Sequence, residues 1–126
     1  MSLIRQGILK SMSGLQPFEG DGISAEFIFP KDFVGFQGHF ENNPILPGVC
    51  KIQAVIVMHE EFQHKTFRLI EVSQAKYFLP VTVDQKITLQ CHSKLNPETG
   101  LTTVKVLVQK EKEKIAMLQL IIQAQG

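Results

Sequence analysis

Short segments in which apolar and polar residues alternate dominate this sequence, and that pattern is typical of strands with one buried face. In residues 24–29, Ala25 and Phe27 fall on one face, and Pro30 ends the segment. The same alternation recurs in the second half of the chain, where it predicts strands at residues 69–79, 86–92, 103–109 and 116–124. The pattern therefore predicts a long antiparallel sheet.

The segments between these strands carry turn and loop signals. Residues 96–100, Asn-Pro-Glu-Thr-Gly, have Pro and Gly where hairpin turns use them. Residues 110–114 alternate in charge, which indicates a second turn that is exposed to solvent. Residues 31–44 contain two glycines and little periodicity, so we expect a shaped loop there.

Residues 48–64 are the segment that predicts a long helix. Pro47 suits its start, because the N–H that proline lacks would be unpaired at that position. Apolar residues occupy most positions from Val49 to Met58, so we expect a helix that is buried on most sides. The last turn of the segment is polar. The whole pattern predicts an α+β domain in which a sheet packs on one central helix.

Composition narrows the class of protein. The chain has 126 residues, of which 44% are hydrophobic and 20% charged, so we expect one folded domain over residues 1–126. The net charge of +1 gives no basic excess for nucleic acid. The longest apolar run, residues 54–58, is far shorter than the ~20 residues that span a membrane. Residues 1–10 lack the apolar core of a secretory signal, and the two cysteines lack metal-site spacing. We therefore expect reduced thiols, no metal and a cytoplasmic location.

Residues 38–49 carry the strongest chemical signal, because they place a histidine on a glycine-flanked loop that leads to a helix start. His39 titrates near neutrality and can take and return a proton. The start of a helix offers free N–H groups and the positive end of a dipole. Gly48 lets a ligand approach that backbone closely. A thioester carbonyl bound there would be polarised, as the formation of an enolate or a tetrahedral intermediate requires.

This segment resembles the signature of the 3-hydroxyacyl-(acyl carrier protein) dehydratases of fatty acid synthesis. The match consists of Gly-His-Phe at residues 38–40, Pro44, and Pro-Gly-Val at residues 47–49. A second stretch, Ala-Lys-Tyr-Phe-Leu-Pro-Val at residues 75–81 with Asp84, resembles the next strand of the family. A loop motif, a helix start and a strand motif thus agree with the family in order and spacing.

The resemblance implies a hotdog fold, in which a long antiparallel sheet wraps around one central helix. It implies that His39 removes the C2 proton of a 3-hydroxyacyl thioester while the Gly48 N–H holds the thioester oxygen. Phe40, Pro47 and Val49 belong to the same motif and are expected to bind substrate. The acyl group would be carried on acyl carrier protein or coenzyme A, and no cofactor is expected, because the thioester itself acidifies the C2 proton. Hotdog relatives form homodimers or larger assemblies of dimers, so we expect the site to lie between two subunits.

The sequence departs from the family at Gln53, where the family has a catalytic carboxylate on the central helix. An amide has no proton to donate near neutral pH, and loss of an acid typically costs ~10²–10⁴-fold in rate. Three interpretations stay open: a dehydratase in which His39 moves the proton through a water, a thioesterase in which Gln53 positions a water, and a non-catalytic acyl-binding protein. The apolar neighbours of Gln53 argue against an exposed position.

Other candidate groups have simpler interpretations. Cys50 lies near the helix start, where a thiolate is stabilised, but we interpret it as a small buried side chain. His59 and His64 are five residues apart, so they face different sides of a helix and do not match a zinc-binding motif. Four basic residues are interpreted as surface charges, which the resemblance places near an acidic acyl carrier protein: Lys51, Lys65, Arg68 and Lys76.

Overall fold

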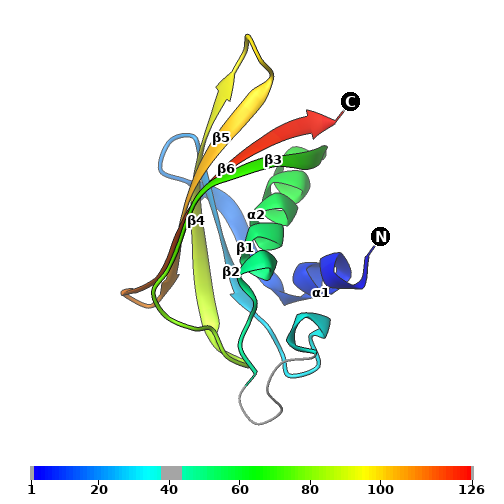
Figure 1. The fold of residues 1–126 in the computed structure, drawn as a ribbon, viewed down its shortest axis with the longest axis vertical. Coiled ribbons are helices and arrows are strands. Elements are labelled where there is room, and N and C mark those ends of the chain that lie inside the picture. The colour runs from blue at the N-terminus through cyan, green and yellow to red at the C-terminus, as the bar shows by residue number, and fades with distance from the viewer. Residues whose placement is uncertain (1, 38–43, 126) are drawn as a thin grey trace.

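The computed structural model describes residues 2–37 and 44–125. Its elements are α1 (Leu3–Ser11), β1 (Met12–Phe18), β2 (Gly22–Ile28), the short 3-10 helix η1 (Val34–Phe36), α2 (Gly48–Gln63), β3 (Thr66–Tyr77), β4 (Lys86–Asn96), β5 (Leu101–Lys110) and β6 (Glu113–Gln125). The described strands form one antiparallel sheet in the order β1-β2-β4-β5-β6-β3. The sheet curls around α2 (Figure 1). The predicted α+β hotdog architecture is confirmed.

Every second residue of the central strands packs toward α2 and forms the core. These buried positions are Ile87, Leu89 and Cys91 on β4, Val104, Val106 and Val108 on β5, and Ala116, Leu118, Leu120 and Ile122 on β6. The predicted alternation is therefore confirmed on these three strands. Ala124, which the pattern also placed on the buried face, is exposed, because it lies next to the last residue of β6 at the end of the sheet.

Helix α2 begins at the predicted residue and ends one residue earlier than predicted. Pro47 is the N-cap, with φ −61°, and its carbonyl accepts the Cys50 N–H at 3.0 Å. His64 adopts a left-handed conformation, with φ 55°, and ends the helix. Because proline has no side-chain acceptor, Pro47 leaves the first-turn N–H groups of α2 uncapped by its own side chain.

The sequence pattern does not predict α1 and β1, and both depend on tertiary contacts. Gly7 lies in the middle of α1, where a helix-weakening residue is unexpected. The Phe33 ring packs on it so closely that a Cβ there would lie 2.7 Å from Phe33 Cδ1. In β1, Gly14 has φ +63° and the register shifts between Ser13 and Gln16. That irregularity interrupts the alternation by which strands are recognised.

The C-terminal half of α2 is joined to the sheet by a buried histidine. His59 is 1% exposed, and both of its ring nitrogens are bonded. Nδ1 lies 2.8 Å from the Val55 carbonyl oxygen, and Nε2 lies 2.8 Å from Ser93 Oγ on β4. Since a carbonyl only accepts, Nδ1–H donates to Val55 and the Ser93 hydroxyl donates to Nε2. Burial lowers the pKa of His59, so the ring is held neutral.

A second link at this end of α2 is ionic. Glu60 Oε1 pairs with Arg5 on α1 at 2.9 Å, and Glu60 Oε2 accepts the Phe67 N–H of β3 at 2.8 Å. One carboxylate therefore holds α1, α2 and β3 together. With His59, it fixes the end of α2 that lies away from the helix start at Gly48.

The edge strand β3 is exposed along almost its whole length. It pairs with β6 on one side, and its other side has no partner strand among the described residues. Several of its apolar side chains are open to solvent, including Leu69, Ile70 and Val72. Exposed apolar side chains on a long edge strand are typical of a surface that pairs with another chain.

Candidate active site at the start of helix α2

The predicted site residues divide into two groups. His39 and Phe40 lie outside the described residues. Pro47, Gly48 and Val49 form the N-cap and the first two positions of α2. The helix start that the motif predicts is thus present.

Tyr77, the last residue of β3, lies over the first residue of α2. A Cβ placed on Gly48 would be 2.7 Å from both Cζ and the hydroxyl oxygen of Tyr77. Any side chain at position 48 would collide with that ring, so glycine is required for the close approach. Burial raises the pKa of the Tyr77 phenol, which therefore remains a hydrogen-bond donor at neutral pH.

Lys51 is buried, and its interpretation as a surface charge is wrong. The side chain is 4% exposed, and its Nζ lies 5.3 Å from the centre of the Tyr77 ring. Its Nζ donates to the Leu46 carbonyl oxygen at 3.4 Å, a long hydrogen bond. Burial lowers the pKa of the Lys51 ammonium. The side chain packs inward because Lys51 shares a face of α2 with the buried Ala54 and Val55, three and four residues later, and because the Tyr77 ring lies over it.

These groups surround one pocket of about 310 Å³ at the start of α2. Backbone and side chains from the segment before α2, the first turn of α2 and the end of β3 contribute to it. Its lining residues are Ile45, Leu46, Gly48, Lys51, Tyr77, Phe78, Leu79 and Pro80. The pocket therefore combines an apolar wall with a helix N-terminus, a phenol and an ammonium.

Gln53 does not line this pocket in the single chain. Its side chain is exposed, contrary to the expectation drawn from its neighbours. Val49, four residues earlier on the same helix face, is 57% exposed. The sheet and α1 cover other sides of α2, so this face is open in the single chain although residues 50–52 and 54–59 of the helix are buried. The role of Gln53 stays a prediction.

Cys50 packs in the core, as predicted. The thiol is 1% exposed, and its Sγ would lie 2.8 Å from a Cβ placed on Gly35. Burial raises the pKa of Cys50, and it raises that of the equally buried Cys91 to about 12. Neither thiol is activated as a nucleophile. Both cysteines are free.

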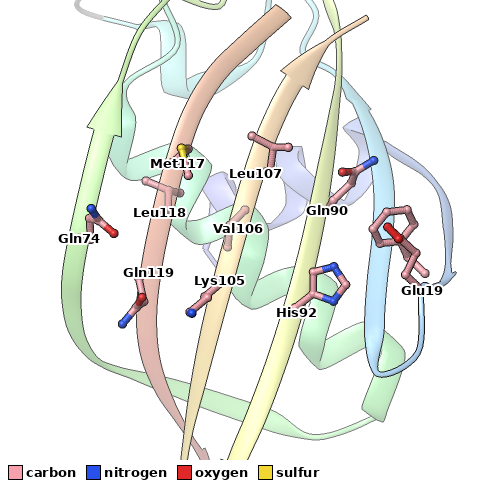
Figure 2. Close-up of a pocket in the computed structure, with 11 residues that line it drawn as sticks. Glu19, Gln74, Gln90, His92, Lys105, Val106, Leu107, Met117, Leu118 and Gln119 are labelled. Carbon is pink, nitrogen blue, oxygen red and sulfur yellow. The ribbon is translucent and has the colours of Figure 1, made fainter. Parts of the chain in front are cut away.

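A second pocket, of about 350 Å³, lies on the opposite face of the sheet from α2 (Figure 2). Its outward side chains alternate with the core residues of the same strands. Among them are His92 on β4, Lys105 on β5 and Gln119 on β6, which follow one another in the cross-strand register. His92 and Lys105 are exposed, as predicted for His92 from the polar face of its strand. This pocket shares no residue with the one at the start of α2.

No helix in residues 2–37 and 44–125 is both long and apolar enough to cross a membrane. In the same residues, no three or more His, Cys, Asp and Glu side chains gather in an arrangement that could hold a metal ion.

Solved structures share the fold at low sequence identity. The ApeI:P dehydratase heterocomplex of Xenorhabdus doucetiae matches with a TM-score of 0.69 and 14% identity, over 89% of this chain and 96% of that one. A sigma28-regulated virulence protein of Campylobacter jejuni matches with a TM-score of 0.71 and 12% identity, over 98% and 96%. A hypothetical thioesterase with coenzyme A from Streptococcus pneumoniae matches with a TM-score of 0.69 and 5% identity, over 98% and 94%. These likenesses establish the fold.

Sequence comparison narrows the fold to a family. The chain is 41% identical over 49 residues to the 3-hydroxyacyl-(acyl carrier protein) dehydratase FabZ of Levilactobacillus brevis, a match that covers 33% of each chain. It thus spans about a third of the length of that curated relative. The family profile for ApeI dehydratases matches residues 16–118, which is most of the chain. The resemblance predicted from the loop, helix and strand motifs is confirmed, and the protein belongs to the ApeI-like dehydratase family.

Proposed function

We propose that this protein removes water from a 3-hydroxyacyl thioester, carried on acyl carrier protein or coenzyme A, to give the 2-enoyl thioester. The observation that carries the proposal is the uncapped start of α2 beside the pocket, in a chain that belongs to a dehydratase family. Gly48 lies beside the Tyr77 ring and lines the pocket. The two free thiols agree with a reducing compartment such as the cytoplasm.

The proposed reaction assigns each group one step. His39 takes the C2 proton, and the electron pair of that C–H bond moves onto the thioester oxygen, which the Gly48 N–H stabilises. The pair then returns to form the C2–C3 double bond as the C3–O bond breaks. The departing hydroxide receives the proton from His39 and leaves as water. Gln53 binds the hydroxyl group or orients a water beside it.

The proposed assembly is a homodimer that pairs two β3 edges. Its support is the edge strand β3, which has no second partner strand among the described residues and exposes Leu69, Ile70 and Val72, together with the exposed face of α2 that carries Val49 and Gln53. Such a dimer would cover both surfaces and bring Gln53 toward the loop of the other subunit. Light scattering of the purified protein is expected to give twice the monomer mass of 14.2 kDa. A stable monomer would contradict the homodimer and favour a mixed assembly, as in the ApeI:P heterocomplex.

The activity is tested with a panel of 3-hydroxyacyl thioesters, in which enoyl absorbance and free thiol are followed together. We expect enoyl product, and a loss of about 10²–10⁴-fold in rate for His39→Ala. His92→Ala removes an exposed histidine from the outer face of the sheet and is expected to keep the wild-type rate. Enoyl product that survives His39→Ala would contradict the assignment of the base.

A thioesterase is the second candidate, because Gln53 stands where the family has a carboxylate and an amide can hold a water for attack on the thioester carbonyl. The same assay separates the two reactions. Free thiol without enoyl product would show that the protein is a thioesterase and not a dehydratase. Binding of the thioester without either product would leave an acyl-binding protein.

A further inference from the structure

The buried ammonium of Lys51, at the start of α2, has no ionic partner in the described part of the chain. The ion pairs found there join Arg5 to Glu60 and Glu61, and Lys86 to Glu26, so no described carboxylate neutralises Lys51. Burial of an ammonium is costly unless it is paired. Lys51 is also the fourth residue of α2, where a cation opposes the helix dipole. One long hydrogen bond to the Leu46 carbonyl offsets little of this cost.

The position of this charge relates it to the backbone of Gly48. The two residues are three apart on one helix face and line the same pocket. A single side chain, Tyr77, touches both: its hydroxyl end lies against Gly48, and its ring faces the Lys51 ammonium. The helix start and the ammonium therefore both lie against the same aromatic ring, with the Lys51 Nζ 5.3 Å from its centre, and both line one pocket. A positive charge that lines the pocket attracts a negative charge that develops in it.

We propose that Lys51 is the cationic group that stabilises negative charge on the thioester oxygen held at the start of α2. The inference rests on the proposed function for its substrate class, an acyl thioester that passes through an enolate. The Gly48 N–H supplies the hydrogen bond, and Lys51 supplies the opposite charge. Tyr77 lies against both. The arrangement lowers the energy of the enolate directly, which partly offsets the absence of an acid at Gln53.

The test separates charge stabilisation from turnover. A 3-oxoacyl pantetheine thioester ionises to an enolate with its own near-ultraviolet absorption, and it cannot lose a 3-hydroxyl group. Wild-type protein is expected to raise the enolate-to-ketone ratio of this probe about tenfold, equivalent to one pKa unit. Lys51→Met, an uncharged side chain of similar length, is expected to abolish the increase. Lys105→Met removes an exposed lysine from the pocket in Figure 2 and is expected to keep it.

Lys51→Gln provides a second variant, because it keeps an N–H donor for the Leu46 carbonyl and removes only the charge. It is expected to behave as Lys51→Met does. Both variants are expected to unfold at an equal or higher urea concentration than wild type, since they remove a buried charge. With a 3-hydroxyacyl substrate, they are expected to lower kcat about 10²-fold with a smaller change in KM.

The outcomes distinguish this inference from the proposed function. Equal enolate ratios in wild type and in the Lys51 variants would overturn the role of Lys51, whether or not the protein dehydrates its substrate. Destabilised variants would also overturn it, because they would make Lys51 a structural partner. If the enolate increase depends on Lys51 but the protein releases no enoyl product, the role of Lys51 stands and the proposed dehydratase activity is contradicted.

Discussion

The two ends of α2 each bury a polar side chain, and the two are treated differently. At the C-terminal end, His59 is neutral and has both ring nitrogens bonded, to Val55 and Ser93. At the N-terminal end, Lys51 has one long hydrogen bond and lines a pocket. Full satisfaction is the mark of a group that supports the fold. A buried charge left partly unsatisfied at a pocket is the mark of a group reserved for a ligand.

The largest expected effect belongs to the N-terminal end. Gly48→Ala places a Cβ within 2.7 Å of the Tyr77 ring, which is half exposed and can be pushed aside. The fold is expected to persist, while the displaced ring and backbone lower kcat/KM about 10²–10³-fold. Steady-state kinetics and thermal melting measure the two quantities. A variant that keeps its activity would show that the helix start does not hold the thioester oxygen.

The opposite result is expected at the C-terminal end. His59→Ala leaves the Ser93 hydroxyl without its acceptor, removes the ring's bond to the Val55 carbonyl and opens a cavity, so it is expected to lower the free energy of unfolding by about 2–4 kcal/mol. The activity per folded molecule should not change. Urea unfolding, with His92→Ala as the exposed control, measures the difference. If folded His59→Ala loses activity, the C-terminal end of α2 also serves the reaction and does not only support the fold.

A substitution at Gln53 tests whether the absence of a carboxylic acid on α2 limits the rate of dehydration. Gln53→Glu is expected to raise the rate of dehydration at least tenfold, which corresponds to ~1.4 kcal/mol of the barrier. The variant changes a side chain that is exposed in the single chain, so the fold should stay as in wild type, and light scattering checks that the assembly does too. If the rate does not rise in a folded dimer, the reaction does not use a helix acid at this position.

The smallest effect is a dependence of stability on pH. Burial lowers the pKa of His59 in the folded protein, so the unfolded chain binds more protons as the pH falls through the ordinary histidine value near 6.5. Stability is therefore expected to be full above that pH and to decline below it. Urea titrations between pH 5 and 8 measure the slope. His59→Ala should flatten it, and an unchanged slope would assign the effect to other groups.

The sequence predicts the parts of the fold that are locally consistent. Strands such as β4 and β5 alternate cleanly because one face packs on α2 and the other faces solvent. The first two elements escape prediction, because Gly7 needs the Phe33 ring beside it and Gly14 bends β1. Those causes are contacts between distant residues, which no local pattern carries.

The sequence likewise predicts only some parts of the candidate site. Its motif predicts the helix start at Gly48, because the spacing of Pro and Gly is a local signal. The pattern does not reveal the burial of Lys51 or the contact with Tyr77, since both require β3 to pass over the start of α2. One signal was available: Lys51 is one of two polar residues between Val49 and Met58, in a helix predicted to be buried on most sides. Gln53 is the opposite case: the pattern predicts a buried side chain and the structure has it exposed, because its apolar neighbours pack on sides of α2 that it does not share.

Tyr77 lies over Gly48 and is also the terminal residue of the edge strand β3. In the proposed dimer, the strand that pairs subunits is the strand that closes the pocket. A ligand that holds the ring in place then favours the assembled form, and assembly raises the affinity for the ligand by the same factor. Affinity would therefore vary with protein concentration, and dilution alone would act as an inhibitor.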